Sequence, residues 1–159
     1  MNCLSAGNLN NALPALTNST FQQIYTDPAL SRFGVRVMRE GVRVAKRAGI
    51  RLESLPDMPS LLICLIDWLA LRLAAARAAA KARSMESPLM GSTLQSLQRG
   101  RPTEIDYLNG EVVRLGGELG VPAPLNARLV ELVHQIERSG RFWKPEALCA
   151  AIDGGRGPA

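Results

Sequence analysis

Aromatic residues and histidine are scarce in this chain. Phe, Trp and Tyr together make up only 4% of its 159 residues, and His134 is its one histidine. Because no Cys or His pair occurs at the spacing of metal ligands, the sequence predicts no metal site. Ala and Leu are abundant instead, and both lose little rotamer freedom in a helix. The composition therefore favours a helical protein over one built from strands.

Cysteine is equally sparse. Cys3, Cys64 and Cys149 are odd in number and far apart in the sequence. Such a pattern gives no disulfide framework, which is typical of proteins kept in a reducing compartment. We therefore expect a cytoplasmic protein, with Cys64 buried as a small apolar side chain.

A long uncharged run is also missing. The most apolar stretch, residues 61–80, is interrupted by Asp67, Arg72 and Arg77. A membrane-spanning helix needs about 20 mostly uncharged residues, so this stretch is expected to be a buried core helix. The N-terminus lacks the basic and apolar regions of a signal peptide. The sequence thus predicts no membrane partner.

The net charge of +5 is not concentrated in any one segment. The basic residues, mostly Arg, are spread along several expected helices, without a dense Lys/Arg block that alternates with aromatics. Of three interpretations of this basic charge, nucleic-acid binding is therefore the least favoured. A solvated surface is the first, and a basic rim around an anion pocket also fits the charge.

Helix start and stop signals occur along the whole chain. Asp27-Pro28 reads as an N-cap followed by a proline at the first helical position, and Gly49 closes that helix. The other expected helices lie within residues 1–16, from 59 to about 83, from 88 to 100, from 103 to 120, after 124 and after 145. Together they predict one all-α domain, a compact multi-helix bundle over residues 1–152, with a disordered tail at 153–159.

Apolar residues at helical spacing define the faces that should form the core. The stripes are Leu30, Phe33, Val37, Gly41 and Val44; Ile105, Leu108, Val112, Leu115 and Leu119; and Leu125, Leu129, Leu132, Val133 and Ile136.

The segment Gly100-Arg-Pro-Thr-Glu-Ile-Asp-Tyr-Leu-Asn-Gly110 carries the strongest chemical signal. It places Glu104 in the first turn of a helix, directly after Arg99 and Arg101. The helix dipole and free amides keep such a carboxylate ionised, and the arginines suit an anionic ligand. Thr103 is expected to cap this helix, with Asp106 completing a variant capping box.

Three further polar residues stand out against apolar helix faces. Asn8 and Asn11 are spaced to share one face, and Ser92 lies in the short helix before Gly100. Each also has a structural reading, since asparagine commonly caps helices and serine is commonly solvated.

Taken together, these residues resemble the C-terminal domain of the ketopantoate reductase (2-dehydropantoate 2-reductase) family. The resemblance runs from about residue 8 to 140, and the run Thr103-Glu-Ile-Asp-Tyr-Leu-Asn-Gly110 is its most specific part. The supporting motifs are Asn8-Leu-Asn-Asn11-Ala-Leu, Ser92-Thr-Leu-Gln95 and Gly120-Val-Pro-Ala-Pro-Leu-Asn126.

The resemblance implies an all-α fold like the C-terminal domain of 6-phosphogluconate dehydrogenase, and a homo-oligomer. It also implies part of a two-domain enzyme that reduces a small 2-keto acid with NADPH. The substrate residues would be Asn8, Asn11, Ser92 and Glu104, and Glu104, which binds the substrate hydroxyl, would be the catalytic one.

The chain departs from the family pattern in two places. The family's nucleotide-binding half is absent, and the glycine cluster Gly116-Gly-Glu-Leu-Gly120 ends a helix rather than following a strand. The lysine expected before Asn8, the family's general acid, falls on Leu4. We therefore expect no cofactor for this chain alone, no reductase activity alone and a possible nucleotide-binding partner segment. The alternative is a non-catalytic helical module that dimerises through residues 61–80.

Overall fold

The computed structural model describes residues 3–4, 8–52, 71–84 and 89–153. Apart from one short strand pairing, the described elements are helices, as the sequence predicts. In chain order they are β1 (Cys3–Leu4), the 3-10 helix η1 (Asn8–Asn10), α1 (Ala12–Leu16), α2 (Phe21–Thr26), α3 (Pro28–Ala48), β2 (Arg51–Leu52), α5 (Leu71–Arg83), α6 (Ser92–Gln98), the π-helix η2 (Asp106–Gly110), α7 (Glu111–Leu119), α8 (Pro124–Ser139) and α9 (Pro145–Asp153).

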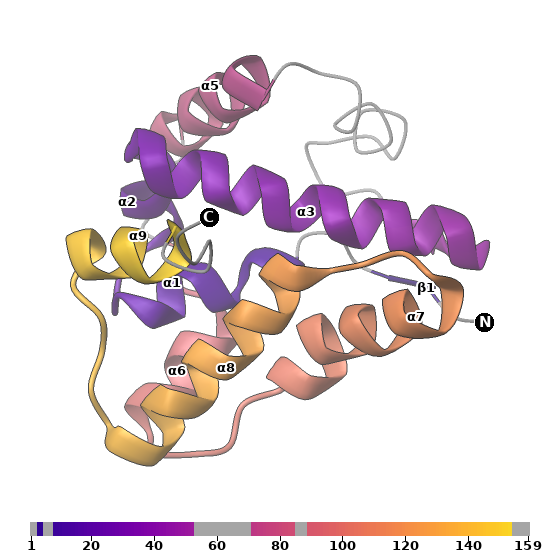
Figure 1. The fold of residues 1–159 in the computed structure, drawn as a ribbon. Coiled ribbons are helices and arrows are strands. Elements are labelled where there is room, and N and C mark those ends of the chain that lie inside the picture. The colour runs from indigo at the N-terminus through magenta and orange to yellow at the C-terminus, as the bar shows by residue number, and fades with distance from the viewer. Residues whose placement is uncertain (1–2, 5–7, 53–70, 85–88, 154–159) are drawn as a thin grey trace.

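The long helix α3 is the centre of the arrangement (Figure 1). It packs against α2 and α5 on one side and against α7 and α8 on the other. The short helix α1 contacts α6 and α8. This arrangement brings α1, α6 and the start of α7 to the same part of the molecule as α8.

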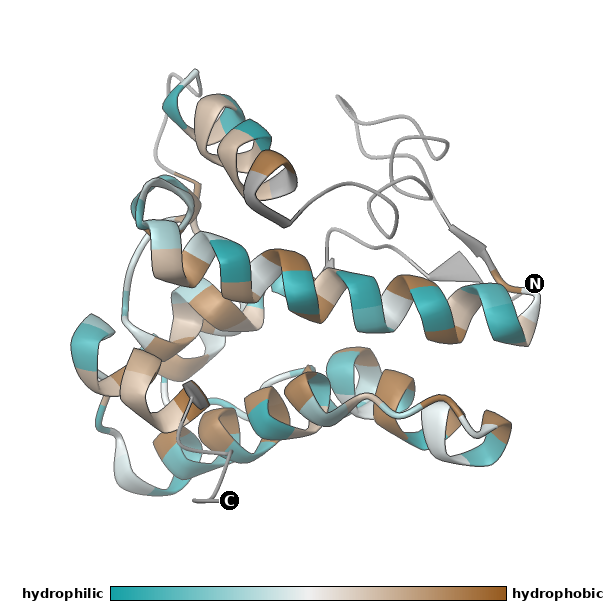
Figure 2. Cartoon of the chain, turned by 45° about the horizontal axis from the view of Figure 1, so that its top comes forward, coloured by the Kyte–Doolittle hydropathy of each residue, from teal (hydrophilic) through white to brown (hydrophobic). Residues whose placement is uncertain are grey.

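The ends of α3 are set by the residues that the sequence indicates. The Asp27 carboxylate accepts hydrogen bonds from the backbone amides of Ala29 and Leu30, at 2.8 and 2.9 Å. At the other end Gly49 adopts the left-handed conformation, with φ of 67°, which glycine reaches without the steric cost of a side chain. Figure 2 shows apolar and polar bands alternating along this helix, as expected for one buried face.

The main core lies where α1, α3, α8 and α9 meet. Its fully buried members include Leu13, Leu16, Val37, Leu132 and Leu148. A second, smaller cluster forms between α3 and α7 around Leu9, Val44, Val112 and Ala123. The three predicted apolar stripes supply most of the main cluster and half of the smaller one, which confirms that these faces contribute to the core.

The helix predicted within residues 1–16 is wrong at Cys3 and Leu4, which form a short strand. Cys3 and Leu4 pair in parallel with Arg51 and Leu52, so their backbone amides bond to the segment after α3 rather than within a helix. Among the described residues of this range, Asn8–Asn10 form a 3-10 helix and Ala12–Leu16 an α-helix. The sequence analysis also missed α2, although a capping box marks its start, since Thr20 and Gln23 bond to each other's backbone amides.

The short helix α6 begins later than predicted, at Ser92 instead of residue 88. Leu89 precedes it because its backbone is bonded to α2: its carbonyl accepts from the Phe21 amide at 3.0 Å, and its amide donates to the Gln22 side chain at 3.1 Å. The predicted helix starts at residues 59 and 88, the run 61–70 and the tail after 153 lie outside the described residues.

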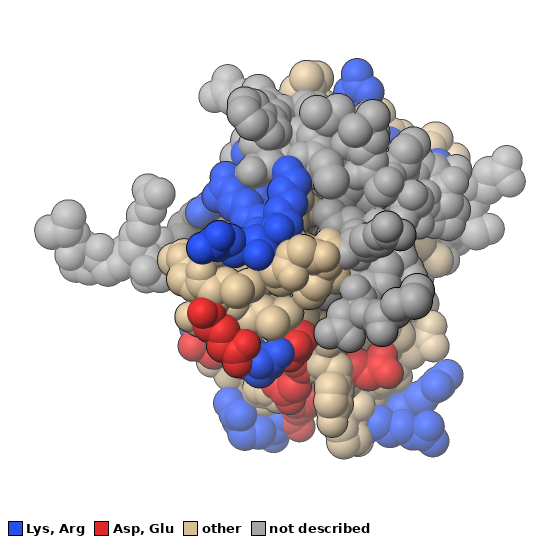
Figure 3. Space-filling view, turned by 90° about the vertical axis from the view of Figure 1, so that its right-hand side faces the viewer, with Lys and Arg blue, Asp and Glu red and all other residues tan. Residues whose placement is uncertain are grey.

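Charge is unevenly distributed at the end of the molecule where α3 finishes. Figure 3 shows Lys and Arg gathered in one group there, with carboxylates below them. The last turn of α3 contributes Lys46 and Arg47, and on α7 Arg114 pairs with Glu111 and Glu118.

Among the described residues, no helix is both long and apolar enough to cross a membrane.

Candidate functional site

Two of the predicted substrate residues meet at the junction of α1 and α6. The Asn11 side-chain amide donates a hydrogen bond to the Ser92 hydroxyl, with the two atoms 3.5 Å apart. The approach is close because Gly91 lacks a side chain; a Cβ there would lie 3.3 Å from the Asn11 carbonyl oxygen. Ser92 is exposed and Asn11 half-buried, so both polar groups can be reached from solvent.

A second contact fixes α6 against the end of α1. The Gln98 side-chain amide donates to the Asn18 side-chain oxygen at 2.7 Å. Asn18 adopts a left-handed conformation, with φ of 51°, which asparagine tolerates better than most residues. The helix carrying Ser92 is thus held at both ends, and the Asn11–Ser92 geometry does not depend on one bond.

The residues next to this pair in sequence are polar and buried. Within the described part of the chain, the Asn10 side-chain oxygen and the Thr93 hydroxyl have no hydrogen-bond partner. Buried polar atoms without a partner are uncommon in folded proteins. The α1–α6 junction is therefore more polar than the core around it.

Glu104 lies at the start of the turn that leads into the π-helix. Its carbonyl accepts from the amides of Tyr107 and Leu108, both at 3.1 Å. The side chain is exposed, and in the region that the structure describes it forms no hydrogen bond or ion pair. Its carboxylate is therefore available to a ligand.

Thr103 caps this turn, as predicted, but Asp106 does not complete the box. The Thr103 hydroxyl accepts from the Ile105 amide at 3.4 Å. The Thr103 amide donates to the Glu137 carboxylate of α8 at 2.8 Å, and Asp106 contacts His134 instead. The amide that Asp106 was expected to bond is thus satisfied by a carboxylate of another helix, α8.

Residues 106–110 form a π-helix rather than the α-helix that the sequence predicts. This extra-wide turn places Asn109, which is fully buried, against two other segments. Its side-chain amide donates to the Leu9 carbonyl at 3.0 Å and to the Asn126 side-chain oxygen at 2.9 Å. Single π-turns occur frequently at functional sites in helical proteins.

A buried carboxylate extends this polar network into α3. Glu40 accepts hydrogen bonds from the backbone amides of Leu125 and Asn126 at 3.0 Å, and from the Asn126 side-chain amide at 2.9 Å. Ala123, the residue before α8, offers no side-chain cap. Glu40 therefore caps α8 from a helix 85 residues away in the sequence. The sequence analysis missed this role, since a glutamate within a helical stretch normally indicates a solvated position.

His134 bridges two carboxylates beside the Glu104 turn. Its Nδ1 lies 2.6 Å from a Glu137 oxygen, and its Nε2 lies 3.0 Å from an Asp106 oxygen. The hydrogen bond to Glu137 raises the pKa of His134 above its ordinary value. Burial lowers that pKa, but by less than this bond raises it, and the bond to Asp106 adds a further, smaller rise. Burial raises the pKa of Glu137, but the bonds from His134 and Thr103 outweigh it and hold that pKa below its usual range.

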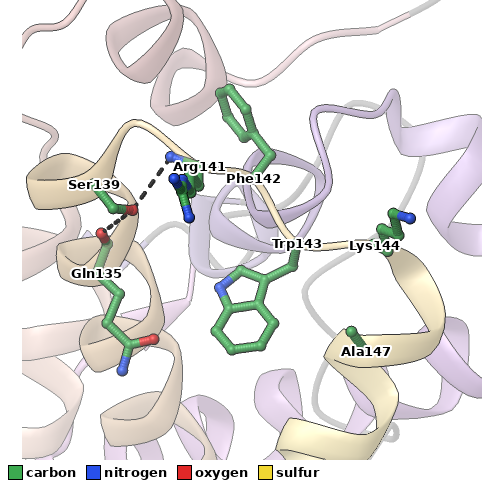
Figure 4. A pocket seen from close by; sticks show the side chains of 7 residues that line it. All are labelled: Gln135, Ser139, Arg141, Phe142, Trp143, Lys144 and Ala147. Carbon is green, nitrogen blue, oxygen red and sulfur yellow. Dashed lines mark hydrogen bonds between the residues drawn. The ribbon is translucent and has the colours of Figure 1, made fainter.

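Two cavities of the described part lie away from the predicted residues. One, of about 290 Å³, lies between the end of α8 and α9 and is lined by Gln135, Ser139, Arg141, Phe142, Trp143, Lys144 and Ala147 (Figure 4). The Trp143 indole and the Gln135 side chain extend into the same space there, while Phe142 points away. The other, of about 210 Å³, lies between α3 and α9. Neither contains Asn11, Ser92 or Glu104.

The family model described as ketopantoate reductase PanE/ApbA C terminal matches residues 3–137. The chain belongs to this family. The family model thus covers β1 to the last turn of α8, including every segment that the sequence motifs indicate.

Individual ketopantoate reductases are also similar to this chain in sequence. A 2-dehydropantoate 2-reductase of Pyrobaculum aerophilum is 29% identical over 123 residues, which make up 77% of this chain and 37% of that protein. One from Pyrococcus horikoshii is 30% identical over 111 residues, 70% of this chain and 31% of that protein. The chain thus spans well under half the length of these curated relatives.

Solved structures agree with the fold. A PanE/ApbA family ketopantoate reductase from Ralstonia eutropha is 31% identical, with a TM-score of 0.58 over 84% of this chain and 40% of that one. D-mandelate dehydrogenase, solved in complex with NADH, is 21% identical, with a TM-score of 0.61 over 84% of this chain and 45% of that one. At that identity the second likeness shows the fold alone.

The glycine cluster at the end of α7 does not have the arrangement of a nucleotide-binding turn. Gly116 and Gly117 lie inside α7, so their amides are not arranged around an anion as in a phosphate-binding turn. Gly116 is also packed, because a Cβ there would lie 2.5 Å from the Val121 carbonyl oxygen. Leu4, at the position expected for the lysine, lies in β1. Asn8 lies in η1, and its side chain is outside the described atoms.

The described residues offer no metal site either, since no group of His, Cys, Asp and Glu there could hold an ion. The structure brings Asn11 into contact with Ser92. It also places the turn that carries Glu104 beside the His134 bridge. The sequence analysis used His134 only to argue against zinc. The signal it passed over is the pair Asp106 and Glu137, whose contacts with His134 depend on how η2 lies against α8.

Proposed function

We propose that this chain is the substrate-binding domain of a 2-dehydropantoate 2-reductase-like, NADP-dependent oxidoreductase that acts on a small 2-keto acid. Membership of the family supports the class of enzyme. The contact between Asn11 and Ser92 is the observation that supports a substrate site in this chain. These residues are 81 positions apart in the sequence, and the same resemblance indicates both as substrate residues.

The proposed roles follow from the chemistry of the side chains. The Asn11 amide and Ser92 hydroxyl are neutral donors that can bind the substrate carboxylate and orient it. The Glu104 carboxylate accepts a hydrogen bond from a substrate hydroxyl and is the proposed catalytic residue of this chain. Asn8 belongs to the same proposed set by resemblance. Arg99 and Arg101, both exposed beside the turn, favour an anionic ligand.

The hydride for such a reduction has to come from NADPH bound by another segment, because the described residues hold no nucleotide-binding turn. We propose that a nucleotide-binding segment, in the same polypeptide or in a partner chain, completes the enzyme. These 159 residues alone would then bind the keto acid without reducing it. A homo-oligomer and a cytoplasmic location remain predictions of the resemblance and of the cysteine content.

Calorimetric titration of the chain with 2-dehydropantoate tests the proposal. We expect saturable binding, and we expect Asn11→Ala and Ser92→Ala each to raise the Kd by roughly three- to ten-fold. This range corresponds to the loss of one hydrogen bond worth about 0.5–1.5 kcal/mol. Glu104→Gln should also weaken binding, without a change in the thermal midpoint, because the side chain is exposed and unpaired.

Ser96→Ala is the matched control, since it removes the same group from the same helix one turn further on. It should leave the Kd unchanged. Binding that is absent in the parent chain, or lost equally in Ser96→Ala, would contradict the proposed site. A sedimentation profile of a stable dimer without any binding would instead favour the non-catalytic helical module.

A further inference from the structure

The surface between α8 and the π-helix η2 contains a histidine held on both sides. His134 Nδ1 contacts Glu137 from its own helix at 2.6 Å, and Nε2 contacts Asp106 from η2 at 3.0 Å. The side chain of His134 is 32% exposed and that of Glu137 is 21% exposed. Both ring nitrogens therefore have a carboxylate oxygen within hydrogen-bond distance.

This geometry requires a particular protonation state. A neutral imidazole carries one N–H, so its other nitrogen would face a carboxylate with two lone pairs opposed. The imidazolium carries an N–H on each nitrogen and can donate to both acids. The arrangement is thus complete only when His134 is charged.

The bridge is connected directly to the turn that carries Glu104. The second oxygen of the Glu137 carboxylate accepts from the Thr103 amide at 2.8 Å, immediately before Glu104. Asp106 is the first residue of η2, two residues after Glu104. The two carboxylates bonded by the ring therefore hold the two ends of one short turn, with Glu104 between them.

Several other charged groups packed around α8 are paired elsewhere. Arg138, one turn after His134, forms no hydrogen bond or ion pair with the ring, and of the described charged side chains only Asp106 and Glu137 shift the pKa of His134. Arg114 on α7 pairs with Glu111 and Glu118. Arg128 and Glu131 pair with each other on α8. From α3, Glu40 bonds the opposite end of α8, and α1 contributes no charged residue. Asp106 and Glu137 are thus the charged groups that face His134 in the described structure.

We propose that His134 is a positioning residue for the substrate site, in which its imidazolium fixes the turn 103–106 and so the direction of the Glu104 carboxylate. The inference rests on the proposed function, because Glu104 matters here as a substrate residue. It adds a dependence on pH that no sequence motif of this chain indicates. Loss of the proton releases one of the two bonds and loosens the turn.

The direction of the pH effect follows from the two shifted groups. The folded-state pKa of His134 is above its ordinary 6.5, so the bridge is complete below pH 6.5 and is lost as pH rises through the folded-state value. The pKa of Glu137 is below its ordinary 4.5, so its contribution is lost only as pH falls through that lower value. Substrate affinity is thus expected to be highest between about pH 4.5 and 6.5 and to decline above.

The bridge itself can be tested by NMR without any ligand. Because His134 is the only histidine, its ring C–H resonances need no assignment. We expect its pKa to be above 6.5, to fall in Asp106→Asn and in Glu137→Gln, and the Thr103 amide resonance to titrate together with the ring. Glu131→Gln, an exposed change on the same helix, should leave the pKa unchanged. A Thr103 amide that does not follow the ring would overturn the inference.

The functional consequence is tested by measuring the Kd for 2-dehydropantoate from pH 5.5 to 8.5. The ligand carboxylate stays ionised across this range, so a change reports the protein. We expect the Kd of the parent chain to rise about five-fold or more through the pKa of His134. His134→Gln should bind weakly at all pH values, whereas Glu131→Gln should keep the parent profile. A His134→Gln variant with the parent pH profile would overturn the inference.

The two experiments separate the inference from the proposed function. If no keto acid binds at any pH while Thr103 titrates with His134, the proposed function fails and the bridge stands as a structural element only. If the keto acid binds with one Kd across the whole range, the proposed function stands and the positioning role is wrong. If His134→Gln does not fold, the pH profile of the parent chain and the Thr103 titration still decide the matter.

Discussion

Glu40 is the residue on which the position of α8 depends most directly. Its carboxylate accepts from three donors at the start of that helix. Glu40→Gln replaces one acceptor oxygen by an NH₂ group that faces these donors, so a buried hydrogen bond is lost and donors oppose each other. We expect a loss of about 1–3 kcal/mol in the free energy of unfolding, measured by urea titration monitored by circular dichroism.

Glu131→Gln provides the comparison for Glu40→Gln. Its side chain is 61% exposed and pairs with Arg128 at the surface, where such pairs are worth little. We expect the urea midpoint of this variant to be almost unchanged. Equal midpoints for the two variants would mean that Glu40 does not cap α8 in solution.

At this scale the sequence revealed local roles and missed distant ones. Thr103 was predicted as a cap and is one, because a cap bonds amides two or three residues away. Asp106 was assigned to the same box wrongly, since its partner is on another helix. Glu40 and Asn126 gave no signal, because their partners lie 86 residues apart and only the tertiary fold brings them together.

At the scale of the helix, α7 contains two adjacent glycines with opposite surroundings. A Cβ on Gly116 would lie 2.5 Å from the Val121 carbonyl oxygen, whereas one on Gly117 would meet nothing within 4 Å. We expect Gly116→Ala to destabilise the chain by about 1–3 kcal/mol through overpacking. Gly117→Ala should stabilise it by up to about 1 kcal/mol, because alanine favours the helix.

Thermal unfolding of the two variants side by side tests this prediction. The sequence change is the same and the positions are neighbours, so the difference reports packing alone. Two midpoints that both rise would show that α7 does not lie against Val121 as described. Helix propensity would then be the only term that acts at both sites.

Most elements were predicted from punctuation and periodicity. Helix α3 begins and ends where Asp27-Pro28 and Gly49 indicate, and α9 begins at Pro145. The π-helix was not predicted, because residues 106–110 have an ordinary helical pattern and the wider turn follows from the contacts of buried Asn109. The N-terminal strand was missed for a similar reason, since it needs a partner at Arg51.

For the whole molecule, the core extends beyond the segment that the family model matches. That match ends at residue 137, yet Leu148 of α9 is fully buried in the main cluster. The Trp143 amide also donates to the Leu16 carbonyl at 2.8 Å. We expect Leu148→Ala to cost about 2–5 kcal/mol, measured by urea unfolding.

Glu146→Ala, an exposed change in the same helix, is the control for Leu148→Ala and should have little effect. If Leu148→Ala were equally mild, α9 would be an appendage of the domain and not part of its core. The all-α architecture itself was predictable from composition and pattern. The pairing of helices within the core was not predictable, because an apolar stripe does not indicate which other stripe it packs against.

The capping of α8 by Glu40 also bears on how the chain folds. An isolated peptide covering Pro124–Ser139 has no capping side chain for its first amides, which only water would then bond, because Ala123 offers no side-chain bond. The helix is complete only after α3 has docked, and the closure of so long a loop carries an entropic cost. We therefore infer that the early and late halves of the chain reach their final helical content in one concerted step.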